Sequence, residues 1–255
     1  MTSALLSDPD LIILETESGE RIPAIHRRCP RAWATIIYSH GNAEDIGVNL
    51  AAIDELAARL RGVASILSYE YVGYSLSRLE GFAASEQGCY RSIDAAWTYL
   101  TRDLRVAPGD IVLWGRSIGS GPTVDLSCRP LARGCAGVVL QCPIASGVRV
   151  LLGQDSALLW LAKSIDIFVN VDKIGLVDCP VAIMHGTADS VVPLCNGEEL
   201  FRLSKRPFRA LWLDGYDHNT LPSQDCAEYT LQFLEMLKSN RASQVGRSSA
   251  TLFCA

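Results

Sequence analysis

The chain has 255 residues, 49% of them hydrophobic, and a formal net charge of -5. This length and hydrophobic content suffice for one large buried core, and the acidic balance without a sustained basic run excludes a nucleic-acid partner. The longest apolar stretches are interrupted well before the ~18 residues that a membrane span needs, so no transmembrane helix is expected.

The N-terminus and the cysteines indicate a cytoplasmic protein. Residues 1–8 have neither the positive region nor the apolar core of a signal peptide, and Thr2 stands where N-myristoylation requires glycine. The nine cysteines include no Cys-x-x-Cys pair and mostly lie in or beside apolar runs. We therefore expect buried thiols in a reducing compartment, with no disulfide framework and no metal site. Cys254 is the exception, an exposed thiol in a polar tail.

Predicted strands and helices alternate along the chain. Residues 11–15 and 21–26 predict an antiparallel hairpin at a sheet edge. Further strands are predicted at residues 33–38, 63–69, 111–114, 136–141, 180–185 and 209–213, and helices at 50–60, 85–103 and 223–237. This alternation predicts one α/β domain over residues 1–238, with a mostly parallel sheet and helices on both faces. Residues 239–255 are expected to form a disordered tail.

The strand at residues 111–114 is followed by the pattern Gly-x-Ser-x-Gly, with Ser117 at its centre. In a nucleophile elbow the serine takes a strained conformation, so Gly115 and Gly119 must lack side chains to let strand and helix approach. The serine is then exposed at a helix N-terminus. There the amide of Ile118 points at an oxyanion formed on a carbonyl under attack.

A serine nucleophile needs a base, and the base needs a carboxylate that fixes its tautomer. Asp189 follows one predicted core strand and His218 follows the last one. The order Ser117, Asp189, His218 is that of α/β-hydrolases. Asp214 also follows a strand and is the alternative acid, although the glycine after it indicates a tight turn.

The loop after the strand at residues 33–38 supplies the second oxyanion donor. We expect this donor to be the backbone amide of Asn42, because the loop lies beside the elbow strand. His40 and His185 each end a strand before a glycine, so structural roles are expected for them. His26 is expected at the surface.

Six motifs resemble the α/β-hydrolase branch of membrane-associated protein depalmitoylases. They lie at residues 38–45, 69–75, 115–119, 122–126, 185–189 and 215–219. The resemblance implies an α/β-hydrolase fold, a serine hydrolase activity and a thioester substrate, and Tyr71 in the second motif is a candidate substrate contact. The sequence departs from the branch in two ways: it has no cysteine-rich, lipidated N-terminal segment, and Glu70 stands where an aspartate is usual.

The interval between residues 141 and 180 leaves room for a minimal lid, so we expect an open site. Its apolar run at residues 157–162 has two interpretations. It is a core-facing helix, or Leu158, Trp160 and Leu161 line an acyl groove or touch a membrane surface.

These observations favour a cytoplasmic serine hydrolase that cleaves acyl thioesters or esters through an acyl-enzyme, with protein depalmitoylation as a candidate activity. The expected partner is an acylated protein or a small acyl ester, with peripheral membrane contact kept open and no cofactor. Two alternatives remain: a peptidase-like or small-ester hydrolase, since the same triad attacks amides, and a non-catalytic binding module, since one fold serves many functions.

Overall fold

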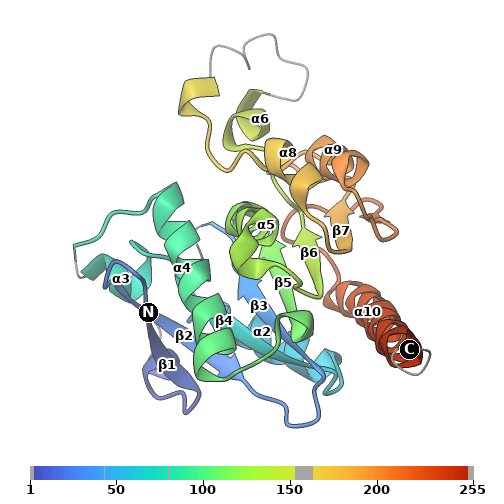
Figure 1. Ribbon diagram of the computed structural model, residues 1–255. Coiled ribbons are helices and arrows are strands. Elements are labelled where there is room, and N and C mark those ends of the chain that lie inside the picture. The colour runs from blue at the N-terminus through green and yellow to red at the C-terminus, as the bar shows by residue number, and fades with distance from the viewer. Residues whose placement is uncertain (1–2, 43, 80, 153–162, 252–255) are drawn as a thin grey trace.

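The computed structural model describes residues 3–42, 44–79, 81–152 and 163–251. Its centre is one eight-stranded sheet in the order β1-β2-β4-β3-β5-β6-β7-β8 (Figure 1). The strands are β1 (Leu11–Glu15), β2 (Arg21–Arg27), β3 (Ala34–Ser39), β4 (Ala64–Tyr69), β5 (Ile111–Arg116), β6 (Gly137–Gln141), β7 (Val181–Gly186) and β8 (Leu211–Leu213). β1 and β2 run antiparallel to their neighbours, and the other pairs are parallel. The predicted α/β architecture with an N-terminal hairpin at one edge is confirmed.

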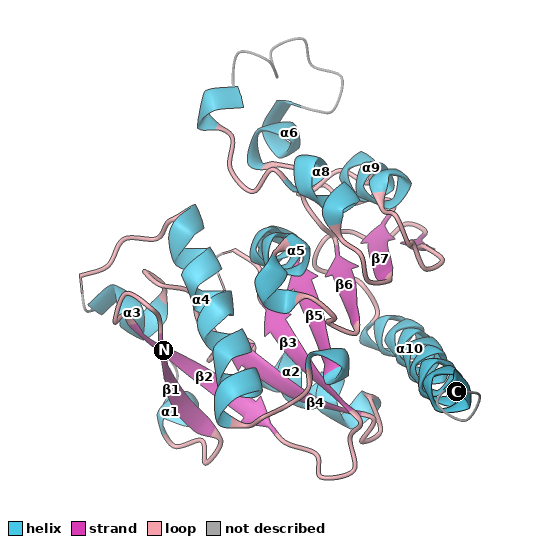
Figure 2. Ribbon diagram, in the orientation of Figure 1, coloured by secondary structure: helices cyan, strands magenta, loops and turns pink. Residues whose placement is uncertain are grey.

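Helices cover both faces of this sheet (Figure 2). One face carries α4 (Glu86–Thr98), α5 (Ser120–Cys128), α8 (Asn170–Lys173) and α9 (Cys195–Leu203), and the other carries α2 (Leu50–Arg59) and α10 (Ser223–Thr251). The remaining short helices include α1 (Ser3–Leu6), α3 (Ser75–Leu79) and α6 (Gly147–Leu152). Among the described residues, no helix combines the length and the apolar character that crossing a membrane requires.

Successive residues of the central strands pack on opposite faces, as the two-residue period of a strand requires. In β5, Leu113 joins the core beneath α4 and α5, and Trp114 joins the core beneath α2 and α10. In β7, Ile183 and Met184 divide in the same way. Because both faces are buried, polar groups collect at the strand ends.

The last helix differs from the prediction. α10 continues to Thr251, beyond the expected helix end at residue 237 and into the segment expected to be disordered. Two features of the sequence account for this: no proline follows Pro222, and Ala, Arg and Gln residues in the tail favour helix.

The sheet changes direction of winding between β3 and β5. The chain passes from β3 to β4 on one side and then returns to β5 on the other side of β3. In sheets of this kind, ligands bind at the carboxyl ends of the strands beside such a switch point. Ser39 of β3 pairs there with Gly115 of β5, directly below the predicted nucleophile.

Candidate active site

Ser117 lies in the sharp turn between β5 and α5. Its φ of 54° is in the left-handed region, which costs a non-glycine residue ~1–2 kcal/mol. A Cβ atom on Gly115 would lie 2.5 Å from the carbonyl oxygen of Gly119, and one on Gly119 would lie 2.2 Å from that of Ser39. Only glycine fits at both positions, which is the physical reason for the Gly-x-Ser-x-Gly spacing.

Asp189 and His218 meet at the same edge of the sheet, after β7 and β8. His218 Nδ1 lies 2.8 Å from Asp189 Oδ2, and His185 Nε2 lies 3.1 Å from the same oxygen. The amides of Val191 and Val192 donate to Asp189 Oδ1 at 3.0 and 2.7 Å. Burial opposes the charge of Asp189, but the hydrogen bonds from His185, His218 and Val192 outweigh it and hold the carboxyl pKa well below its usual range. Asp189 is therefore an ionised acceptor for a proton on His218 Nδ1.

The predicted nucleophile is near the surface of this edge but is not bonded to the base. A hydrogen bond joins Asp189 to His218. Within the described part of the chain, no hydrogen bond joins His218 to the Ser117 hydroxyl. Ser117 and His218 are 8% and 6% exposed, so both retain a small opening to solvent. Catalytic hydrogen bonds are often long before substrate binds.

The alternative acid, Asp214, has a different environment. It is exposed and accepts a hydrogen bond from the Thr187 hydroxyl at 3.0 Å, which fixes the turn after β8. Asp217, which we did not single out from the sequence, accepts from the amides of Ser190 and His218 at 2.7 and 2.8 Å. It therefore ties the loop of Asp189 to the loop of His218.

The predicted oxyanion donors lie on two adjoining segments. Ile118 follows the serine in the elbow, and Asn42 lies in the loop after β3. A Cβ atom on Gly119 would lie 2.6 Å from the carbonyl oxygen of His40, so the elbow packs directly against this loop. The Tyr74 hydroxyl holds the loop further by donating to Asn42 Oδ1 at 2.9 Å.

Glu70 organises the loop from inside the protein. Its carboxylate is fully buried and faces His40 Nε2 at 2.9 Å, while His40 Nδ1 faces the Gly41 carbonyl oxygen at 2.9 Å. The amides of Ile46 and Tyr71 also donate to this carboxylate, at 3.3 and 3.1 Å. The longer glutamate side chain thus joins the loops after β3 and β4. No local pattern in the sequence indicated this role.

Tyr71 requires a correction. Its side chain is fully buried, its hydroxyl donates to the His40 carbonyl oxygen at 2.7 Å, and its ring stacks on that of His40 with centroids 4.3 Å apart. Burial excludes the predicted contact with substrate, and Tyr71 instead holds the loop after β3, which carries Asn42. The other two predicted substrate contacts, Leu158 and Trp160, lie outside the described residues.

Arg116, the residue before the nucleophile, connects three loops. Its guanidinium forms a salt bridge with Glu44 and donates to Asn219 Oδ1 at 2.7 Å. Glu44 in turn accepts from the Gly41 amide at 3.2 Å and from Asn49 at 2.8 Å. Arg116 therefore links the elbow to the loop after β3 and to the loop that carries His218. This side chain also lines a cavity of about 260 Å³ beside His218.

The prediction that His26 lies at the surface is wrong. His26 is buried in β2, not at the surface, and burial followed by the charge of Arg28 lowers its pKa to about 4.

Cys142 Sγ lies within 4.8 Å of donor atoms of Asp189 and His218, which is the spacing of metal ligands. Burial and the charge of Asp189 raise the pKa of this thiol, and Asp189 is already hydrogen-bonded to His218 and to two backbone amides.

The sheet order, the elbow after β5, and the acidic and histidine loops after β7 and β8 define an α/β-hydrolase. Solved structures agree in fold. An esterase domain from a Rhodothermus marinus protein has a TM-score of 0.63 and 16% identity, covering 89% of this chain and 96% of its own. A puromycin-hydrolyzing peptidase of Mycobacterium tuberculosis has a TM-score of 0.69 and 16% identity, covering 93% and 40%. No family model matches the chain.

The chain belongs to the alpha/beta hydrolase domain-containing protein 17 family. It is 36% identical over 230 residues to the alpha/beta hydrolase domain-containing protein 17B of Xenopus tropicalis. The aligned residues cover 90% of this chain and 74% of the relative. The human protein of the same name is 35% identical over the same length. The resemblance to α/β-hydrolases predicted from the six motifs is thus confirmed, and the protein is a hydrolase.

Proposed function

We propose that this protein is a serine hydrolase that cleaves acyl thioesters or esters through an acyl-enzyme on Ser117. The observation that carries the proposal is the pairing of a serine with φ of 54° and a hydrogen-bonded Asp189–His218 pair at one edge of the sheet. A binding module would have no need of a strained serine beside an oriented imidazole.

In the proposed reaction, the Ser117 hydroxyl attacks the acyl carbonyl and His218 Nε2 takes its proton. Asp189 stabilises the resulting imidazolium through Nδ1. The amides of Asn42 and Ile118 donate to the oxyanion, and collapse of the intermediate expels the thiol or alcohol, which receives the proton from His218. Water, activated by the same histidine, then hydrolyses the acyl-enzyme and releases the acid.

Exposed apolar side chains on the carboxyl side of the sheet support an acyl-chain substrate, and protein depalmitoylation is the activity we propose. α6 lies above the carboxyl edge of the sheet (Figure 1). Leu151 of α6 is 83% exposed and Ile165 is 75% exposed, and Leu152 and Ile167 are also exposed. Such side chains suit a fatty acyl group presented on a protein or at a membrane surface.

A fluorophosphonate probe tests the proposal directly. We expect the wild type and Ser239→Ala, a matched control at an exposed serine of α10, to be labelled on Ser117. Ser117→Ala should be neither labelled nor active on p-nitrophenyl octanoate. Folded Ser117→Ala that keeps the wild-type hydrolysis rate would exclude Ser117 as the nucleophile.

Chain length separates a fatty acyl substrate from a small ester. Each buried methylene contributes about 0.8 kcal/mol, or roughly fourfold in kcat/KM. We expect kcat/KM to rise from acetyl to octanoyl thioesters and Leu151→Ser to reduce that rise while leaving acetyl hydrolysis unchanged. A preference for acetyl would contradict the acyl-chain assignment and favour the small-ester or peptidase alternatives.

A further inference from the structure

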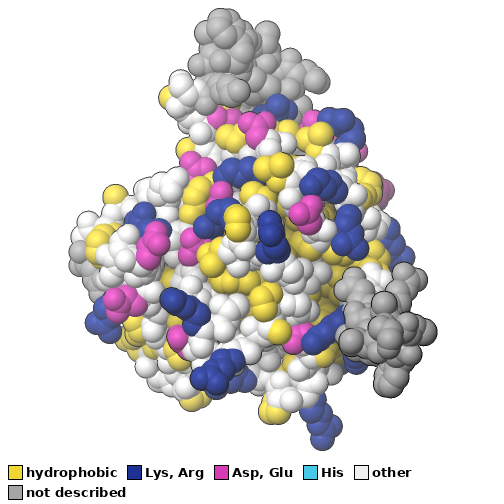
Figure 3. Space-filling model, viewed as in Figure 1, with side chains coloured by type: hydrophobic (Ala, Val, Ile, Leu, Met, Phe, Trp, Pro, Cys, Tyr) yellow, Lys and Arg dark blue, Asp and Glu magenta, His cyan; other side chains and the backbone are white. Residues whose placement is uncertain are grey.

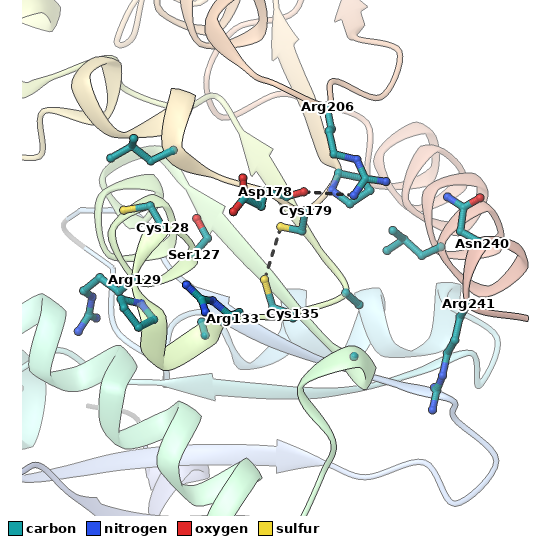
Figure 4. Close-up of a pocket in the computed structure, with 18 residues that line it drawn as sticks. Ser127, Cys128, Arg129, Arg133, Cys135, Asp178, Cys179, Arg206, Asn240 and Arg241 are labelled. Carbon is teal, nitrogen blue, oxygen red and sulfur yellow. Dashed lines mark hydrogen bonds between the residues drawn. The ribbon is translucent and has the colours of Figure 1, made fainter. Parts of the chain in front are cut away.

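A second cavity, of about 350 Å³, is lined by the residues drawn in Figure 4. Gly109, Ala136 and Pro180, which precede β5, β6 and β7, belong to its wall, so it is formed at the amino ends of these strands. It lies between α5 and α10, and four arginines line it: Arg129, Arg133, Arg206 and Arg241. In the view of Figure 3, basic side chains are spread among acidic and apolar ones. Nothing in the proposed hydrolysis uses this cavity.

Two thiols lie together in its wall. Cys135 Sγ and Cys179 Sγ are 3.4 Å apart and point toward each other (Figure 4). The cysteines precede adjacent strands, β6 and β7, which are in register at Val138 and Val181. Neighbouring strands lie ~4.8 Å apart, within the range of Cα separations that a disulfide spans. Only a small movement of the two sulfur atoms is needed to reach a bond of about 2.05 Å.

The charges around the thiols favour an anionic reagent. Arg133 and Arg206 line the cavity on either side of the cysteine pair, and Arg206 also donates to the Asp178 carbonyl oxygen at 3.2 Å. The hydrogen bond with Cys135, followed by burial, raises the pKa of the Cys179 thiol. A thiolate is the attacking species, so one thiol of the pair must lose its proton before exchange begins.

We propose that Cys135 and Cys179 form a reversible disulfide by exchange with an anionic disulfide of the glutathione type. One thiol of the pair loses its proton and attacks one sulfur of the oxidant, which breaks the oxidant's disulfide and releases one glutathione that takes up that proton. The other thiol then attacks the protein sulfur of the mixed disulfide. The second glutathione leaves as a thiol with the proton of this second cysteine, so two protein thiols are oxidised as one disulfide is reduced.

The test uses the full chain in buffers of increasing ratio of oxidised to reduced glutathione, followed by acid quench, alkylation and mass spectrometry. Wild-type protein should lose two hydrogens and yield a cross-linked peptide pair containing Cys135 and Cys179. Cys128→Ser is the matched control, because Cys128 lines the same cavity but its thiol donates to the Asp125 carbonyl oxygen at 3.2 Å. This variant should form the same cross-link.

The single variants trap the mixed disulfide. Cys179→Ser and Cys135→Ser should each form no cross-link, and each should accumulate one glutathione on the cysteine that remains. The proposal is overturned if Cys135 and Cys179 of the wild type both remain alkylatable in the most oxidising buffer, or if either forms its disulfide with a different cysteine. Hydrolysis by Ser117, at the other edge of the sheet, is a separate readout, so the two proposals can fail independently.

Discussion

Replacing Asp189 with asparagine changes which ring nitrogen of His218 carries the proton. The asparagine side chain has nearly the same shape as the aspartate side chain. Asp189 Oδ1 accepts from two backbone amides, so the asparagine carbonyl oxygen takes that place. Its NH₂ group then faces His218 Nδ1, which lies 2.8 Å from Oδ2 in the native protein. An NH₂ group only donates, so Nδ1 must become the acceptor and the ring proton moves to Nε2. The nitrogen that should accept the serine proton is then blocked.

The cost follows from this exchange of tautomer. The same change in serine proteases lowers kcat by about 10⁴-fold, which is roughly 5.4 kcal/mol of transition-state stabilisation at about 1.36 kcal/mol per tenfold. The asparagine NH₂ also faces His185 Nε2, which is 3.1 Å from Oδ2 and already 2.8 Å from the Val192 carbonyl oxygen. Two donors then meet in a buried site, so we also expect a lower Tm.

The assay is hydrolysis of an octanoyl thioester under saturating conditions, with circular dichroism to confirm folding. Asp214→Asn is the matched control, since Asp214 is exposed and bonded to Thr187, and we expect it to stay within about threefold of wild type. An Asp189→Asn protein with a normal rate, together with an inactive Asp214→Asn, would refute the assignment of the acid.

Three more predictions concern residues whose contacts became visible only in the structure. Glu70→Gln should lower kcat by about 10²-fold with a smaller change in KM, because a displacement of ~1 Å in the loop after β3 would misplace the Asn42 amide. An unchanged kcat would contradict the positioning role of Glu70. Arg116→Lys should lower kcat/KM at least tenfold, because lysine lacks the planar fork that reaches both Glu44 and Asn219; wild-type kinetics would argue against the three-loop link. The third concerns His26, whose pKa is 6.5 in the unfolded chain and about 4 in the folded protein. Between these two pH values the unfolded chain binds a proton at His26 and the folded protein does not. The free energy of unfolding therefore falls by up to about 3 kcal/mol as the pH drops from 6.5 to 4. In urea unfolding, His26→Gln should lose less stability than wild type over this range, and equal losses would refute the role of His26.

The fold and the position of the elbow could be predicted because local rules determine them. Gly115 and Gly119 are required by the turn itself, and the buried strand before Ser117 is visible as an apolar run. The order of Ser117, Asp189 and His218 at strand ends follows once parallel strands are assumed, since their carboxyl ends share one edge.

Other features depend on contacts between residues far apart in the chain. Glu70 acts on His40 and Arg116 acts on Asn219, and no local pattern encodes which loops meet. His26 and Tyr71 were predicted to be accessible, but both are buried. β2 and the loop after β4 are covered by segments that are distant in the sequence, and no local pattern shows which segments pack there. The tail was predicted to be disordered because its composition is polar, whereas its helix-favouring residues allow α10 to continue to Thr251.

Trapping of the acyl-enzyme tests the central claim most directly. The purified protein is mixed with an octanoyl thioester, quenched with acid within the first turnover, digested and mapped by mass spectrometry. We predict an octanoyl ester on Ser117 in the wild type that is absent from Ser117→Ala and strongly reduced in His218→Ala. Turnover of the thioester without any acyl group on Ser117, or with the acyl group on a cysteine, would contradict the proposed mechanism.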